Sequence, residues 1–163
     1  MKTFTFYLNA SNHFLNTSDY SKLSKEEKDY NHFASVLFSW ISLESFINSV
    51  SESLAKGKRL NINEVAFLNE YEYKVNDEGN FNQINIRPST TKKILFILNH
   101  FSKFNLKKFK QSKVWRDLKN FEDLRNKIIH HKEKNNLSIN LKKATDCRDI
   151  SKEAINYITK KLK

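Results

Sequence analysis

The sequence predicts an all-α fold: a helical bundle of about five to six helices around an antiparallel pair of long helices. Two observations support this class. The 163 residues include only 2 Gly and 1 Pro, which are too few for a chain built from strands and tight turns. Apolar residues recur at intervals of three, four and seven, as on one face of an α-helix. The length suits one domain with a single core, so we expect residues 1–163 to form one helical domain.

The first two helices are expected before residue 57. The segment 4–15 is ambiguous between helix and strand, and its context favours helix. Ser24 and Glu27 form a predicted capping box, in which each side chain accepts a hydrogen bond from the other residue's backbone amide. This box opens a long helix that ends at about Lys56. Glu44 falls within the apolar stripe of that helix, so its carboxylate needs a partner or must become neutral. The stripe contains Phe33, Leu37, Trp40, Ile47 and Leu54.

Four further helices complete the predicted bundle. Their starts are set by capping residues and their ends by turn residues. In chain order we expect a helix over about 63–73, a loop over 74–88, a helix capped by Ser89 or Thr90, a helix over about 110–131 and a helix over about 145–162.

The positive charge is concentrated in the C-terminal part of the chain. Residues 1–102 contain 11 Lys and Arg against 11 Asp and Glu, whereas residues 103–163 contain 18 against 7 and so carry the whole net charge of +11. Such asymmetry attracts polyanions and favours a nucleic-acid partner. The alternative is a lysine-rich surface that serves only solubility.

Composition also bears on the compartment. The single Cys147 excludes a disulfide framework within the chain and indicates a reducing environment. No signal pattern or apolar run of membrane-spanning length is evident, so we expect a soluble cytoplasmic protein with no membrane contact. Adjacent histidines diverge on a helix and no carboxylate has chelating spacing, so we predict no metal site and no cofactor.

An arginine and a histidine near the end of the fifth predicted helix are the main candidates for chemistry. Arg125 shares a helix face with an apolar group, and a buried guanidinium requires a partner for its charge. Glu44 is the only charged residue that we expect in a similar place elsewhere, so we predict that it accepts hydrogen bonds from Arg125 or orients it through water. The alternative is an ion pair without a catalytic role. The apolar group contains Leu118, Phe121, Ile128 and Ile129.

His130 suits proton transfer near neutral pH. It lies about 140° around the helix from Arg125, and two arrangements still bring both side chains to one phosphate. Either the helix ends at His130 and the imidazole turns back, or two chains meet across a two-fold axis. Asn126 has the spacing to hold one ring nitrogen. The alternative role for His130 is a helix C-cap.

The segment from Leu124 to His130 resembles the signature of the HEPN superfamily, an Arg and a His separated by four to six residues, often with a polar residue directly after the Arg. The segment from Trp40 to Asn48 looks like the second core helix of that family. The resemblance implies a helical core that usually dimerises around a basic cleft. It implies that Arg125 and His130 are the catalytic pair and that Asn126 supports them.

What the resemblance implies for function is a metal-independent endoribonuclease. Such proteins act as toxins with a cognate antitoxin, or as antiphage effectors in abortive infection and CRISPR immunity. Other members have lost activity and bind RNA or a partner protein, which is the alternative here. Two features depart from the family: Lys132 stands where one branch carries a modifiable Tyr, and residues 58–101 are longer than a minimal core requires, as a family-variable insertion would be.

Further RNA contacts are expected close to the motif, at Lys127, His131 and Lys132. The lysine-rich stretch 103–119 is a second candidate, although its aromatic residues Phe104, Phe109 and Trp115 fit a core position better. The chemistry requires RNA, because the 2′-hydroxyl is the nucleophile. His130 would transfer protons and Arg125 would stabilise the charged phosphorane. We expect a 2′,3′-cyclic phosphate and a 5′-hydroxyl, formed in excess EDTA.

Overall fold

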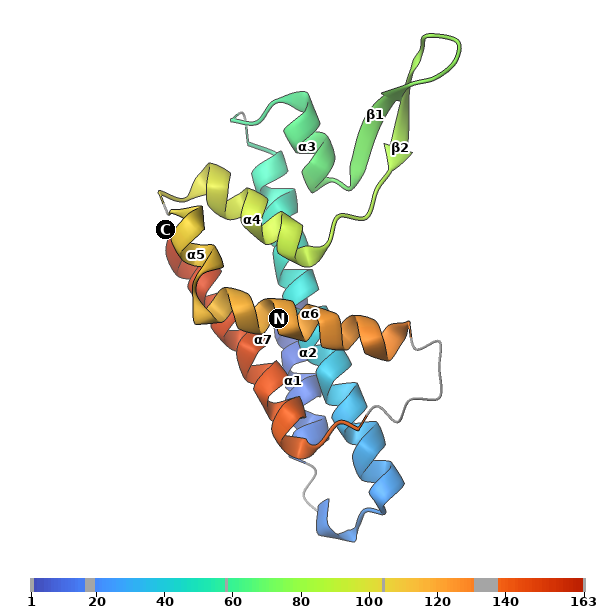
Figure 1. Cartoon of the computed structure of the whole chain (residues 1–163), viewed down its shortest axis with the longest axis vertical. Coiled ribbons are helices and arrows are strands. Elements are labelled where there is room, and N and C mark those ends of the chain that lie inside the picture. The colour runs from blue at the N-terminus through green and yellow to red at the C-terminus, as the bar shows by residue number, and fades with distance from the viewer. Residues whose placement is uncertain (1, 17–19, 58, 104, 131–137, 163) are drawn as a thin grey trace.

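The computed structural model describes residues 2–16, 20–57, 59–103, 105–130 and 138–162. Within these ranges the chain is mostly helical, with one small antiparallel hairpin, and the predicted all-α class is confirmed (Figure 1). The elements are α1 (Thr3–Leu15), a 3₁₀ turn (Tyr20–Lys22), α2 (Lys25–Ala55), α3 (Ile62–Leu68), β1 (Tyr71–Val75), β2 (Phe81–Asn85), α4 (Thr90–Phe101), α5 (Leu106–Lys110), α6 (Lys113–Ile129) and α7 (Leu141–Lys161).

The long helix α2 is the centre of the fold, and α1 and α7 pack along it. Its predicted capping box is confirmed at Ser24 and Glu27. Buried hydroxyls join the three helices: Ser11 Oγ of α1 lies 2.9 Å from Ser35 Oγ and 2.7 Å from Ser39 Oγ of α2. From α7, Ser151 Oγ donates to the Ser39 carbonyl at 2.7 Å. These polar groups are buried but satisfied, so they fix how the helices align at little cost in stability.

The hydrophobic core lies where α2, α4, α6 and α7 meet. Apolar side chains from all four helices are completely or almost completely buried there. The segment 58–101 therefore contributes to the core through α4 and through Leu68 of α3, while the hairpin of the same segment lies beyond one end of it (Figure 1). Representative core residues are Val36, Leu43, Ile47, Ile94, Ile97, Leu98, Leu118, Phe121 and Ile158.

The predicted arrangement around an antiparallel pair of long helices is not confirmed. α6 runs across α2, and α1 and α7 are the helices that lie along it (Figure 1). The predicted helix 110–131 corresponds to α6, which begins at Lys113 because Ser112 caps it. The short helix α5, capped by Asn105, precedes it. Where α6 crosses α2, the Phe121 and Trp40 rings pack edge to face, with their centroids 5.0 Å apart.

The prediction of a loop over 74–88 is wrong. Tyr71–Val75 and Phe81–Asn85 form an antiparallel hairpin that projects away from the helices (Figure 1). Aromatic and β-branched residues at alternate positions favour strands, and the Asn76 side chain accepts the Glu78 and Asn80 amides to close the turn. Gly79 has the positive φ that such a turn requires. The expected helix 63–73 ends early, at Leu68.

The other boundaries are close to those expected. The segment 4–15, which was ambiguous, is helical. The last helix begins at Leu141 rather than near residue 145, because Asn140 rather than a later residue caps it.

By length and composition alone, α2 is apolar enough to cross a membrane. Its most apolar window has a mean hydropathy of 1.3, and 44% of that window is buried in the fold. The expectation that no segment reaches this length is therefore wrong for α2. A core helix of a soluble protein passes the same test, so this property does not distinguish the two kinds of helix.

Candidate functional site

A polar cleft of about 620 Å³ lies where α2, α4 and α6 meet the foot of the hairpin. We call it the α6 cleft. Its volume falls within the range of small-ligand sites. Its lining includes Trp40, Glu44 and Asn48 of α2, Glu70 and Arg87 at the foot of the hairpin, Thr90 and Lys93 of α4, and Glu122, Arg125, Asn126 and His130 of α6 and its C-cap.

Glu44 is the centre of a hydrogen-bond network in this cleft. Its Oε1 atom accepts from Trp40 Nε1 at 2.7 Å and from Thr90 Oγ1 at 3.3 Å. Arg125 Nη2 lies 3.4 Å from the same oxygen. The predicted contact between Glu44 and Arg125 is therefore confirmed, and it joins α2, α4 and α6 at one carboxylate.

Arg125 lies at the edge of the core and not within its apolar stripe. Its side chain is 25% exposed, and Ile129, expected on the same buried face, is exposed. The buried face of α6 is rotated towards Leu118, Phe121, Glu122 and Leu124. The prediction of a deeply buried guanidinium is wrong, because the hairpin and α4 leave this side of α6 open as a cleft wall.

The Arg125 guanidinium is only partly satisfied. Its Nη1 donates to Asn126 Oδ1 at 3.1 Å, and its Nε is buried without a hydrogen-bond partner among the described residues. A buried donor without an acceptor is uncommon in folded proteins and calls for an explanation such as a catalytic role or a bound water. The guanidinium thus retains donor capacity in a cleft that can admit an anion.

His130 is the C-cap of α6. Its backbone amide donates to the Asn126 carbonyl at 2.9 Å, and its side chain is exposed and lines the α6 cleft. Arg125 and His130 thus line one cleft of one chain, as the first of the two predicted arrangements requires. Asn126 differs from expectation: its amide oxygen accepts from Arg125, and among the described residues no hydrogen bond joins it to the imidazole.

The other predicted RNA contacts are not brought together with this pair. Lys127 lines a separate hollow of about 330 Å³ between α6 and α7, beside Lys143 and Cys147. His131 and Lys132 lie outside the described residues. In the lysine-rich stretch, Phe109 is completely buried and Trp115 packs against the core, so their predicted core role is confirmed. Phe104 lies outside the described residues.

Sequence reasoning missed two buried charged residues next to the cleft. Lys93 is 3% exposed, and its Nζ donates to Asn48 Oδ1 at 2.9 Å and to Glu70 Oε1 at 2.7 Å. Glu122 is 5% exposed and accepts from Thr91 Oγ1 with both oxygens at 3.0 Å. Glu44 is thus not the only charged residue on an apolar helix face. Helical spacing was the available signal, since Lys93 precedes the buried Ile97 by four residues and Glu122 follows the buried Leu118 by four.

Two histidines far from the motif have structural contacts. His32 Nδ1 lies 2.8 Å from the Ile139 carbonyl. The His100 ring stacks on Phe96 and its Nε2 lies 2.9 Å from a Glu64 oxygen. In the part of the chain that the structure describes, no three His, Cys, Asp or Glu side chains gather as a metal ion would need.

Comparison with protein-family models, with curated proteins and with solved structures finds no match to this chain. The fold and the site therefore define a mostly helical protein with a polar cleft. Into that cleft one helix brings a guanidinium and an imidazole.

Proposed function

We propose that this protein is a metal-independent endoribonuclease of HEPN type that acts as a toxin or antiphage effector in the cytoplasm. The observation that carries the proposal is the shared cleft of Arg125 and His130. The contact of Arg125 with Glu44 supports it further, because a held guanidinium loses little freedom when it binds a phosphate.

The reaction follows from the two side chains. The RNA 2′-oxygen forms a bond to phosphorus while the bond to the leaving 5′-oxygen breaks. A base takes the proton of the 2′-hydroxyl, and an acid gives a proton to the leaving 5′-oxygen. His130 serves as one of these two groups and the His130 of a second copy as the other, while Arg125 stabilises the charge on the equatorial phosphate oxygens. The products are a 2′,3′-cyclic phosphate and a 5′-hydroxyl. Because the nucleophile is the 2′-hydroxyl, DNA of the same sequence is not cleaved.

A cleavage assay tests this proposal. Purified protein is incubated with single-stranded RNA in excess EDTA, and the ends of the products are identified by mass spectrometry. His130→Ala and Arg125→Ala should lose activity. Arg116→Ala is the matched control, because this arginine is exposed on the same helix and does not line the cleft. Loss of wild-type cleavage on chelation would contradict the mechanism.

The second candidate function is an inactive HEPN module that binds RNA or a partner protein. The observation that favours it is the charge of residues 103–163, which attracts RNA whether or not cleavage follows. Expression in bacteria separates the two functions. A nuclease should be toxic as the wild type and tolerated as His130→Ala or Arg125→Ala, whereas equal toxicity of all three indicates binding.

The proposal includes a homodimer and a cognate antitoxin protein as partners. A second copy would supply a second Arg125 and His130, so that one histidine serves as base while the other serves as acid. Light scattering at micromolar concentration measures the oligomeric state. A strict monomer requires that one chain build the whole site.

A further inference from the structure

The charges of the α6 cleft are balanced in pairs. Among the described residues that line it, Glu44 contacts Arg125 and Glu70 contacts Lys93. The third carboxylate, Glu122, contacts Lys119 and the Thr91 hydroxyl. Each acid is therefore already close to a cation, and these pairs contribute little net charge to the cleft.

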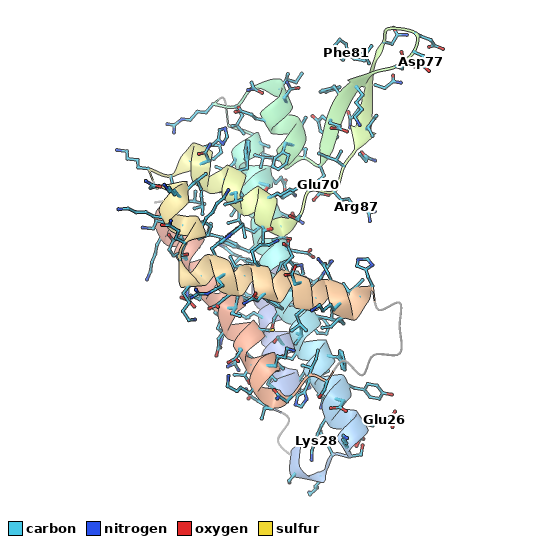
Figure 2. The ribbon with its side chains drawn as sticks, viewed as in Figure 1. Glu26, Lys28, Glu70, Asp77, Phe81 and Arg87 are labelled. Atoms are coloured by element: carbon cyan, nitrogen blue, oxygen red, sulfur yellow. The ribbon has the colours of Figure 1, made fainter. Side chains whose placement is uncertain are left out.

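Arg87 is a lining cation outside these pairs. It is exposed, and in the described part of the chain no carboxylate contacts it. Figure 2 shows it at the foot of the hairpin, beside Glu70. The positive charge that the cleft presents to a ligand thus comes mainly from Arg87, together with the partly paired Arg125 and, when protonated, His130.

The backbone around Arg87 is held in place on both sides. Before it, the Ile86 amide donates to the Glu70 carbonyl at 2.8 Å. After it, Pro88 restricts the backbone of Arg87 to extended conformations, and Ser89 caps α4 by accepting the Lys92 amide. The backbone from which the Arg87 side chain extends is therefore fixed relative to α4.

Arg87 enters the cleft from a different element than the predicted catalytic pair, which comes from α6. Arg87 therefore offers a second cation, on another wall of the same cleft, to a strand whose cleaved phosphate lies at Arg125 and His130. A guanidinium binds two phosphate oxygens with parallel hydrogen bonds. The cleft volume of about 620 Å³ lies in the range of small-ligand sites, which suits a short segment of a single strand.

We infer that Arg87 is a substrate-positioning residue that binds a phosphate flanking the cleaved one, so that the substrate is single-stranded RNA crossing from α6 to the foot of the hairpin. This inference rests on the proposed function. Its specific content is that Arg87 contributes to binding along the strand and not to the bond-breaking step.

The experiment measures binding and cleavage separately. The binding probe is a short fluorescein-labelled oligouridylate with methylated 2′-hydroxyls, which cannot be cleaved, and its anisotropy is followed over a series of KCl concentrations. Arg87→Ala should weaken binding about tenfold, as loss of a charge-assisted contact does. It should also reduce the slope of log Kd against log salt by about 0.7. Arg87→Lys should keep the slope and lose part of the affinity.

Cleavage of the unmethylated RNA then separates positioning from chemistry. Arg87→Ala should raise KM about tenfold and leave kcat within about twofold. Arg59→Ala is the matched control, because Arg59 is an exposed arginine that does not line the cleft. Arg87 is exposed and outside the ion pairs of the cleft, so its variants should fold, and thermal melting checks this.

The outcomes separate this inference from the proposed function. If the wild type cleaves RNA and Arg87→Ala matches it in slope and KM, the inference is overturned and the function stands. A fall in kcat at unchanged KM also overturns it. If the wild type binds without cleaving and Arg87→Ala lowers the salt slope, the phosphate contact is supported and the nuclease activity is refuted. A wild type that neither binds nor cleaves RNA overturns both.

Discussion

Arg125 Nη2 of α6 lies 3.4 Å from Glu44 Oε1 of α2, and the two residues are 81 positions apart in the chain. The same carboxylate oxygen accepts from Trp40 and from Thr90 of α4. A single side chain therefore holds three helices together and also fixes the guanidinium that we propose to act on phosphate. Loss of stability and loss of activity must be measured apart at this position.

Glu44→Ala should destabilise the fold by about 1–3 kcal/mol, because it leaves three donors without their acceptor. Glu44→Gln should cost less, since it keeps an oxygen at the same place. Urea unfolding followed by circular dichroism measures both. Glu52→Ala is the control on the same helix: Glu52 forms an exposed pair with Lys56, and such pairs contribute little to stability. Equal stability of Glu44→Ala and the wild type would show that the network is not needed for folding.

Arg125→Lys tests whether geometry or charge matters at this position. A lysine keeps the positive charge, but one ammonium group cannot contact Glu44, Asn126 and two phosphate oxygens together. We expect cleavage to slow by about 100-fold or more, measured in single turnovers. Arg116→Lys, an exposed position of α6 outside the cleft, should be unchanged. Near-normal cleavage by Arg125→Lys would mean that a point charge suffices.

Thr91→Val tests the buried carboxylate of Glu122. The substitution preserves shape but removes the hydroxyl that donates to both carboxylate oxygens. We expect a loss of about 1–3 kcal/mol in unfolding free energy. Thr91→Ser retains the hydroxyl and should lose much less. If both variants melt alike, the packing of the methyl group and not the hydrogen bond determines stability.

Cys147 should be unreactive in the folded protein. Burial raises the pKa of its thiol to about 12, with the neighbouring Asp146 adding to the effect. At pH 8 the nucleophilic thiolate is then a fraction of about 10⁻⁴. Iodoacetamide should label the protein only after denaturation, as mass spectrometry can show. Because the folded pKa is raised above the ordinary value of 9.0, the stability from burying the neutral thiol is full below pH 9 and is lost as the pH rises towards 12. Fast labelling of the native protein would contradict the buried position.

The helices and their starts were largely predictable, because capping and periodicity are local properties. The box at Ser24 and the cap at Ser89 set the starts of α2 and α4 as expected. The contact between Glu44 and Arg125 was also predictable, because each charge falls on or beside an apolar helix face, where a partner of opposite charge is required. Here a local pattern was sufficient to predict a contact between distant parts of the chain.

Features that depend on the tertiary arrangement were not predictable in the same way. The strand residues 71–75 and 81–85 fall in a predicted helix end and a predicted loop, because Gly79 and the single Pro88 favour a loop over this segment. The crossing of α6 over α2 depends on how α1 and α7 cover α2, which no single helix pattern encodes. Arg87 gave no periodic signal at all, and only the assembled cleft shows its position.

The hairpin also has a practical consequence for work with the purified protein. It is a two-stranded sheet whose outer edges meet no third strand in the described part of the chain. Val75 and Phe81, paired near its tip, are 58% and 75% exposed, and Figure 2 shows Phe81 far from the helical body. Unpaired strand edges beside exposed apolar side chains promote self-association. Concentrated samples are therefore expected to aggregate through this tip before the helices unfold. Phe81→Lys should delay this aggregation.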